Sequence, residues 1–241
     1  MNGRETYPPL NILKPVAEDV WIVDGPAIRF GPRWFSMPFP TRMTVIRTGT
    51  GLFIHSPTAL PDPLRAEIEK LGPPRWIAGP NRIHYWWIPD WHRAFPDAEV
   101  YLAPKTGQSA KGRIDFPANA LDRMSGYPWD REIATLPVAG RFMTEAVFFH
   151  KRSRTLVLAD FIENFEPRKL GWFMRLLTRL GGANGSMPRD MRLTYRDRKA
   201  LRAAVMTMIE WGPERVIIAH GRWFERDGVG ALRRAFSWLL D

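Results

Sequence analysis

Three polar residues each follow an apolar run, at points where a buried strand would end. His84 lies on the loop after the run RWIAGP, Asp160 follows residues 156–159, and His220 follows residues 216–219. Two imidazoles and one carboxylate are a donor set for a single Zn²⁺, Mn²⁺ or Fe²⁺ with coordination positions left open. Such an ion activates water or polarises an ester or phosphoester oxygen. The pattern therefore predicts a mononuclear site in which these three residues are the metal-binding and catalytic residues.

The same three side chains also allow an interpretation without a metal. A carboxylate at the end of a buried strand is costly unless it meets a cation or several N–H donors. Two histidines could supply those donors. The three residues would then form a hydrogen-bonded Asp–His cluster without catalytic activity, and the sequence leaves both interpretations open.

The loop around His84 carries further groups that could contact a ligand. Asn81 could add an amide oxygen to the metal site, and Trp86 and Trp87 could form an aromatic wall close to Arg82. We therefore expect Asn81, Trp86 and Trp87 to form the ligand-binding or cofactor-binding part of the site. The other histidines, which we expect to be structural, are His55, His92 and His150.

Strands and helices must hold these residues in place. Short runs rich in β-branched and aromatic residues predict strands, and apolar residues at helical spacing predict helices. We expect strands at 20–24, 43–47, 51–55, 76–78, 98–103, 133–138, 146–150, 155–159 and 215–219, and helices at 63–71, 90–95, 192–211 and 230–240. Two sets of strands with helices between and after them indicate two packed sheets covered by helices. The predicted fold class is α/β, a four-layer αββα sandwich in a single domain over residues 1–241.

The composition limits what kind of protein this chain can be. Its 241 residues include no cysteine, which excludes disulfides, thiolate metal ligands and cysteine nucleophiles. No apolar run is long enough to span a membrane, so we expect a cytoplasmic protein, with peripheral membrane contact as an alternative. The net charge of +10 favours anionic partners in general. A nucleic acid is the less favoured partner, because no zinc-finger, P-loop or helix-turn-helix pattern accompanies the charge.

The stretch 167–187 predicts a basic amphipathic insertion within this domain. Trp172 and Phe173 are adjacent, so they lie about 100° apart around a helix and widen its apolar arc. Arg175 and Arg179 lie four residues apart and form a basic stripe beside that arc. We expect this stretch to pack only partly on the sandwich and to contact an anionic membrane or a second subunit in a homodimer. Ordinary core packing is the alternative.

The order of elements resembles the metallo-β-lactamase superfamily over nearly the whole chain, and most closely a divergent branch catalogued as a bacterial domain of unknown function. Asp160 matches the bridging acid of the superfamily, on a strand that reads Leu-x-x-x-Asp. His220 matches its last His, before Gly, and His84 matches the final His of its metal loop, His-x-His-x-Asp-His. The resemblance implies the αββα fold and a hydrolase-like site in which the second metal position is kept.

Other positions depart from the superfamily pattern. Gly79, Asn81 and Ile83 take the first three ligand positions of the metal loop, and Ser56 replaces the acid of an Asp-x-Gly turn. The stretch 137–141 lacks the His of a Pro-Gly-His turn. The resemblance therefore implies that the first, three-His metal position is essentially empty, and we do not expect a two-metal mechanism.

Two functions remain in view. The first is a metal-dependent hydrolase-like protein with a reduced, mononuclear site, which would act on a small-molecule ester or phosphoester. The second is a non-catalytic binding module of the same fold for a small anionic or aromatic ligand.

Overall fold

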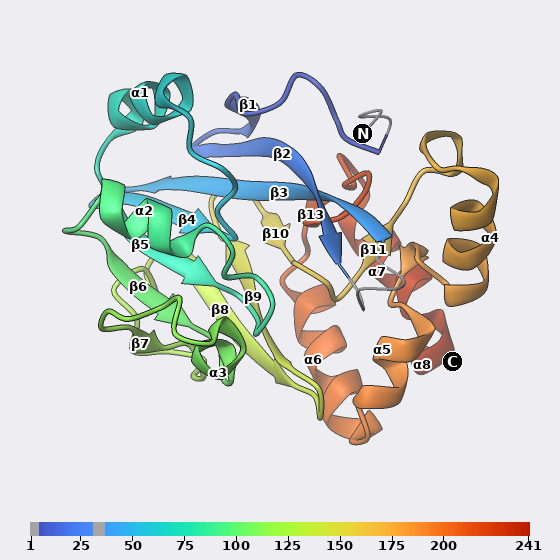
Figure 1. Ribbon diagram of the computed structural model, residues 1–241. Helices are drawn as coiled ribbons and strands as arrows, with labels where there is room; N and C mark the ends of the chain where they lie inside the picture. The colour runs from blue at the N-terminus through green and yellow to red at the C-terminus, as the bar shows by residue number, and fades with distance from the viewer. Residues whose placement is uncertain (1–4, 31–36) are drawn as a thin grey trace.

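The larger of two packed sheets contains seven strands in sequential order, β1 to β7 (Figure 1). The computed structural model describes residues 5–30 and 37–241, so residues 1–4 and 31–36 of the expected domain lie outside the described residues. Strands β1 to β4 pair antiparallel and β4 to β7 pair parallel. The strand bounds are β1 (Lys14–Ala17), β2 (Val20–Phe30), β3 (Met37–Thr48), β4 (Gly51–His55), β5 (Pro74–Gly79), β6 (Glu99–Leu102) and β7 (Asn119–Ala120).

The smaller sheet has the strand order β13-β10-β9-β8. Strands β8 to β10 form an antiparallel meander, and β13 pairs parallel with β10. Because parallel neighbours end at the same edge of a sheet, the residues that follow β10 and β13 lie close together. The strand bounds are β8 (Ile133–Ala139), β9 (Thr144–His150), β10 (Thr155–Val157) and β13 (Arg215–Ile217).

Aromatic side chains fill the space between the two sheets. The ring of Phe53, from β4, lies 4.8 Å from Trp129 and 4.9 Å from Phe148, measured between centroids. All three side chains are buried. Burying one such side chain contributes roughly 1.5–3 kcal/mol. This core fixes the sheets relative to one another and thereby fixes the strand ends at which the polar residues lie.

Helices cover the outer faces of both sheets. Leu64 and Ile68, one helical turn apart in α1, pack on the larger sheet together with Trp91 of α2. Leu201 and Val205 of α6 pack in the same way on the smaller sheet. The predicted αββα sandwich is therefore confirmed. The bounds of the covering helices are α1 (Asp62–Leu71), α2 (Ile88–Ala94), α6 (Arg198–Glu210), α7 (Gly228–Ala235) and α8 (Ser237–Leu240), and α3 (Thr106–Ala110) is a short helix after β6.

The segment between β10 and α6 forms a separate two-stranded sheet and two further helices. Its strands β11 (Glu163–Asn164) and β12 (Asn184–Ser186) pair antiparallel. Between them come a 3₁₀ turn (Pro167–Lys169) and the helix α4 (Trp172–Gly181), and α5 (Arg189–Thr194) follows. Figure 1 shows α4 at the right-hand edge of the molecule. No helix of the described residues is both long and apolar enough to cross a membrane.

Two of the predicted helices are each divided in two. The helix expected at 192–211 is interrupted at Tyr195, where α5 has ended, and α6 begins after Asp197. The side chain of Asp197 accepts a hydrogen bond from the Ala200 N–H. The helix expected at 230–240 is interrupted at Phe236. Tyr195 and Phe236 both pack on the ring of Phe161. Burial of an aromatic side chain therefore outweighs the helical pattern at both positions.

Candidate metal centre

His84, Asp160 and His220 meet where three loops leave the sandwich, after β5, β10 and β13. Asp160 Oδ2 lies 3.1 Å from His84 Nε2, and Asp160 Oδ1 lies 3.0 Å from His220 Nε2. One ligand atom from each residue lies within 4.8 Å of the other two, so the group could hold a metal ion. The structure thus brings together the three residues that the sequence singled out.

Each histidine is oriented by a partner on its other ring nitrogen. His220 Nδ1 lies 2.6 Å from Pro40 O, and because a carbonyl only accepts, Nδ1 must donate a hydrogen. His84 Nδ1 lies 2.6 Å from the hydroxyl of Ser56. Both Nε2 atoms are therefore turned toward Asp160. Metal-ligating histidines are oriented in the same way, by a hydrogen bond on the nitrogen that does not bind the metal.

Asn81 contacts Asp160 through its amide nitrogen, and it does not offer an oxygen to the candidate metal site. Its Nδ2 donates to Asp160 Oδ2 at 2.7 Å and to Glu145 Oε2 at 3.2 Å. Its Oδ1 accepts from the Ile83 N–H at 3.0 Å. With two carboxylates on one side and a backbone donor on the other, only the amide NH₂ can face the site. This arrangement corrects the expectation that Asn81 adds an oxygen ligand, and makes Asn81 a positioning residue for Asp160.

Glu145 is a buried acid of β9 that sequence reasoning missed. Its carboxylate accepts hydrogen bonds from the N–H groups of Ala159 (2.8 Å), Asp160 (2.9 Å) and Phe161 (3.2 Å). Burial and the negative charge of Asp160 raise the pKa of Glu145 to about 7, against the lowering by these three donors. Glu145 therefore fixes the backbone that presents Asp160.

Asp160 and His220 form a charged pair. Burial alone would raise the pKa of Asp160, but the charge of His84 and the hydrogen bonds from His220 and His84 hold it well below its usual value. Burial would lower the pKa of His220, but the hydrogen bond and the charge of Asp160 raise it. A cation that binds His220 must displace the proton on Nε2.

Arg42 connects the loop that carries His220 to the larger sheet. This buried side chain donates from Nη1 to Ile218 O and Gly221 O, both at 2.8 Å. Its Nη2 pairs with Asp24 at 2.6 Å. Gly221 has a φ of 95°, and a Cβ there would collide with the neighbouring backbone. One guanidinium therefore holds the carbonyl groups on both sides of His220.

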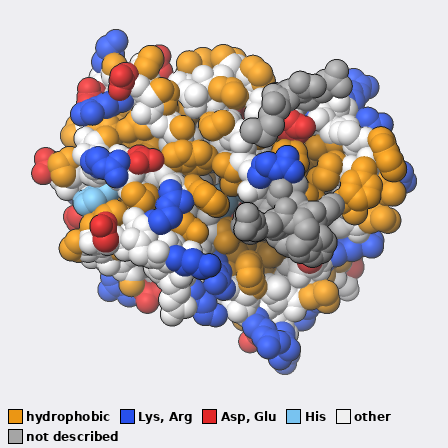
Figure 2. All heavy atoms as spheres, viewed as in Figure 1, with side chains coloured by type: hydrophobic (Ala, Val, Ile, Leu, Met, Phe, Trp, Pro, Cys, Tyr) orange, Lys and Arg blue, Asp and Glu red, His pale blue; other side chains and the backbone are white. Residues whose placement is uncertain are grey.

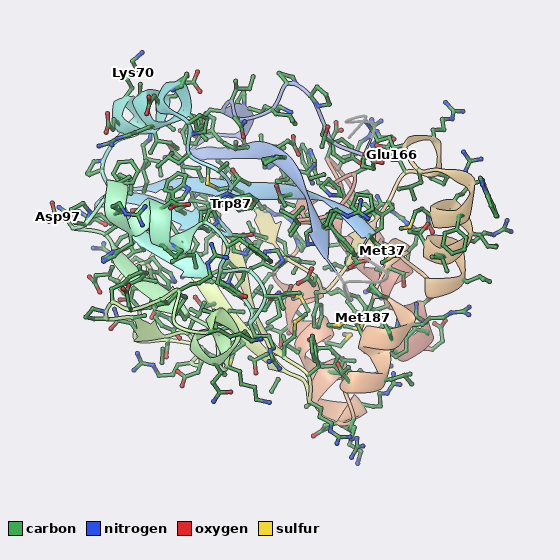
Figure 3. The ribbon with its side chains drawn as sticks, in the orientation of Figure 1. Met37, Lys70, Trp87, Asp97, Glu166 and Met187 are labelled. Atoms are coloured by element: carbon green, nitrogen blue, oxygen red, sulfur yellow. The ribbon has the colours of Figure 1, made fainter. Side chains whose placement is uncertain are left out.

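The candidate site opens onto a pocket of about 980 Å³. Its polar end is lined by Ser56, His84, Asp160, Glu163 and His220. The rest is mostly apolar and comes from β3, α4 and α5, with Phe39, Met174, Leu177 and Met191 among the lining residues. Figure 3 shows Met37, another lining residue, between the end of the larger sheet and α4.

Trp86 and Trp87 both line this pocket, as expected for an aromatic wall. Trp86 is partly exposed, and the guanidinium of Arg113 lies 5.2 Å from its ring. Trp87 packs against the apolar cluster of the outer face of the larger sheet. Arg82 does not line the pocket. Its Nε instead donates to Ser109 Oγ at 2.9 Å. The described geometry therefore gives the pocket aromatic walls without the cation of Arg82.

His92 and His150 have structural contacts, as expected. His92 stacks on Phe116 with ring centroids 4.1 Å apart, and His150 Nδ1 lies 2.8 Å from Ser153 Oγ.

Glu163 is a second acid that sequence reasoning missed. Burial raises its pKa to about 8, although the charge of His220 lowers it. Glu163 is half-buried in the short strand β11, and an isolated acid there carries no sequence signal for a place in the pocket.

His55 predicts a pH dependence of stability. Within the described part of the chain neither of its ring nitrogens has a hydrogen-bond partner. Burial, followed by the charge of His84, lowers its pKa from 6.5 to about 3. Below about pH 6.5 the unfolded chain binds a proton that the folded chain does not bind, so stability is lost as the pH falls toward 3, by about 1.4 kcal/mol per pH unit. We expect His55→Leu to remove this loss.

Urea denaturation of wild type and His55→Leu at pH 7 and pH 5 measures this effect. The difference between their free energies of unfolding should change by about 2 kcal/mol in favour of the variant at the lower pH. At pH 7 the variant should be as stable as wild type or slightly more so, because it replaces an unpaired buried polar group. Parallel pH profiles for the two proteins would show that His55 is not the cause.

Comparisons with known proteins agree with the fold. A family model described as a domain of unknown function (DUF4336) matches residues 20–171. No curated protein sequence matches the chain. The solved structure of DIM-1 metallo-β-lactamase exposed to ceftazidime is 15% identical, with a TM-score of 0.64 over 98% of this chain and 97% of that chain.

Two further solved structures give the same result. The metallo-β-lactamase from Hirschia baltica is 17% identical, with a TM-score of 0.60 over 94% of this chain and 96% of that chain. FIM-1 from Pseudomonas aeruginosa, in its mono-zinc form, is 12% identical, with a TM-score of 0.59 over 95% of this chain and 94% of that chain. At these identities the likeness shows the fold alone, which is that of the metallo-β-lactamases.

Proposed function

The chain belongs to the family described as a domain of unknown function (DUF4336), and we propose its function from its own site: a metal-dependent hydrolase with a mononuclear centre. The observation that carries the proposal is the convergence of His84, Asp160 and His220 at the polar end of a large apolar pocket. We propose that its substrate is an ester or phosphoester with a long apolar portion.

The three side chains suit one Zn²⁺, Mn²⁺ or Fe²⁺ ion. Imidazole and carboxylate donors are appropriate for these metals, and the hydrogen bond from His220 Nδ1 to Pro40 O leaves Nε2 as the ligand atom. When bound, the cation supplies Lewis-acid chemistry, because it polarises a carbonyl or phosphoryl oxygen and makes water more acidic. FIM-1, which has a similar fold, is itself known in a mono-zinc form. A single ion is therefore compatible with this fold.

The chain's own residues position and enclose the reacting groups. Ser56 and Pro40 orient the two imidazoles. Asn81 donates to the carboxylate of Asp160, and Glu145 accepts from the backbone N–H of the same residue. The mostly apolar walls would displace water from the rest of the pocket when a substrate fills it. Preorganised groups in such an enclosed site stabilise developing charge more strongly than water does.

The pocket supports the proposed substrate class. Its volume of about 980 Å³ and its mostly apolar lining would suit an alkyl or acyl chain. Each methylene that leaves water contributes about 0.8 kcal/mol. Phe39, Leu177 and Met191 would contact this chain, and the scissile group would lie at the polar end beside His84.

The competing function is a binding module without turnover. Asp160 already receives hydrogen bonds from Asn81, His84 and His220, which favours this alternative because a carboxylate with three donors does not require a cation. The same apolar pocket would then hold a small ligand. The two functions differ in a simple way: only the hydrolase should need metal.

A chain-length series tests the proposal. We expect metal-loaded protein to hydrolyse 4-nitrophenyl acyl esters or the matching alkyl phosphodiesters, with kcat/KM rising by up to about fourfold per added methylene. Adding a chelator should abolish turnover, and Zn²⁺, Mn²⁺ or Fe²⁺ should restore it. Leu177→Asp, in the pocket wall, should flatten the chain-length dependence and leave the metal content unchanged.

Met124→Asp, at an exposed site, provides the matched control and should behave as wild type. Binding of the same long-chain compounds with no turnover under any of the three metals would reject the hydrolase and support the binding module. Hydrolysis with no dependence on chain length would retain the hydrolase and reject the apolar substrate class.

A further inference from the structure

The helix α4 is apolar on the side that faces solvent. Its exposed residues include Trp172 (79% exposed), Leu180 (59%), Leu176 (48%) and Phe173 (45%). Figure 2 shows hydrophobic side chains gathered at the right-hand edge of the molecule, where Figure 1 places α4. A surface helix of a soluble domain normally turns charged and polar residues to that side. The apolar outer side therefore needs an explanation other than packing in the core.

The order of residues around the helix separates two apolar faces. At about 100° per residue, the exposed residues Trp172, Leu176, Leu180 and Phe173 occupy one continuous arc. Leu177 and Met174 lie on the following arc and line the pocket, and Leu180, at the border between the two arcs, also lines it. Packing in the pocket wall thus accounts for the inner arc, whereas the side chains of Trp172 and Leu176 on the outer arc stay 79% and 48% exposed.

Charge indicates what covers the outer arc. Arg175 and Arg179 lie beside Trp172 on the helix, and both are exposed. Residues 167–189 contain five basic residues and no acidic residue: Arg168, Lys169, Arg175, Arg179 and Arg189. An apolar arc with a basic border complements an anionic membrane surface, where apolar side chains enter the acyl boundary and cations meet phosphates.

A second copy of the chain fits this surface less well. In a two-fold dimer the same patch faces itself, so Arg175 and Arg179 would approach their own counterparts. With no acidic residue between 167 and 189 to pair with them, that contact would bring like charges together. The charge pattern therefore favours a lipid surface over a self-contact.

We propose that the outer arc of α4 docks the protein on an anionic membrane surface. Trp172, Phe173, Leu176 and Leu180 enter the interface, and Arg175 and Arg179 contact the headgroups. Because the inner arc of the same helix lines the pocket, the docked protein holds the pocket wall against the bilayer. The proposal does not depend on a bound metal or on turnover.

Sedimentation with vesicles tests the proposal on the full chain. We expect wild type to bind phosphatidylglycerol–phosphatidylcholine vesicles at low salt, to bind pure phosphatidylcholine weakly, and to dissociate at high salt. Arg175→Glu with Arg179→Glu should weaken binding by about 30-fold or more, at about 1 kcal/mol for each basic residue lost. The pair Lys70→Glu and Arg131→Glu makes the same change in net charge away from α4 and should have little effect. All four residues are exposed, so these variants should fold.

A site-specific label distinguishes docking through α4 from general charge attraction. The chain contains no cysteine, so Leu176→Cys provides one attachment point for an environment-sensitive fluorophore. Its emission should shift to the blue when anionic vesicles are added, whereas the same label at Lys70→Cys should not respond. No binding to anionic vesicles, equal loss in both charge-reversal pairs, or a silent label at position 176 would overturn the proposal. A blue shift that grows with protein concentration without lipid, together with elution as a dimer, would overturn it in favour of a self-contact.

Discussion

Glu145→Ala is expected to cost about 4 kcal/mol or more of folding stability and to weaken metal binding. The carboxylate accepts hydrogen bonds from the backbone N–H groups of residues 159–161 and from Asn81. Each buried donor left without an acceptor costs about 1–3 kcal/mol, and the removed side chain also leaves a cavity. The backbone that presents Asp160 would lose its support. Urea denaturation gives the stability, and a metal titration of the folded variant gives the affinity.

Two variants make this prediction specific. Glu145→Gln keeps the shape but turns an NH₂ group toward donors, so its loss of stability should be intermediate. Glu225→Ala removes an exposed carboxylate with only a long contact of 4.0 Å to Arg222, so it should change stability by less than about 0.5 kcal/mol. If Glu145→Ala unfolds at the same urea concentration as wild type, Glu145 does not support the Asp160 backbone.

Asp160→Asn is expected to lower the affinity for a divalent cation by more than about 100-fold. Loss of an outer-shell partner alone costs about 10–100-fold in metal affinity, and Asp160 is the only acid of the candidate ligand group. The variant keeps the side-chain shape but removes the negative charge between His84 and His220. Competition with a coloured chelator measures the affinity.

His150→Gln is the matched control for Asp160→Asn. It alters another buried residue, on β9, whose ring nitrogen contacts Ser153 and not the candidate ligand group. Its metal affinity should equal that of wild type. Equal affinities in Asp160→Asn and wild type would show that any bound cation lies elsewhere.

The sequence was informative where chemistry coincides with strand ends. Asp160 and His220 each follow a short apolar run, and the parallel pairing of β10 with β13 brings both to one edge. His84 comes from the other sheet, so its approach depends on how the two sheets pack. The resemblance to the metallo-β-lactamase superfamily supplied that packing, and the TM-scores of the solved structures agree with it.

The supporting residues could not be predicted in the same way. Glu145 lies in a strand that is otherwise apolar apart from its ends, and its partners are 14 to 16 residues away around a turn. The contact from Asn81 to Asp160 spans 79 residues, and that from Arg42 to Ile218 spans 176. Such partners are set by tertiary packing and not by local pattern. This is why the direction of the Asn81 amide was predicted wrongly.

Elemental analysis combined with a metal titration is the most direct test of the central claim, that His84, Asp160 and His220 hold one cation. The protein would be purified without an affinity tag, stripped with a chelator and titrated with Zn²⁺, Mn²⁺ and Fe²⁺. We predict one equivalent of one of these metals per chain, with an affinity that falls as the pH is lowered, because the cation competes with the proton on His220. Failure of all three metals to bind, or stoichiometric binding that survives Asp160→Asn unchanged, would contradict the claim.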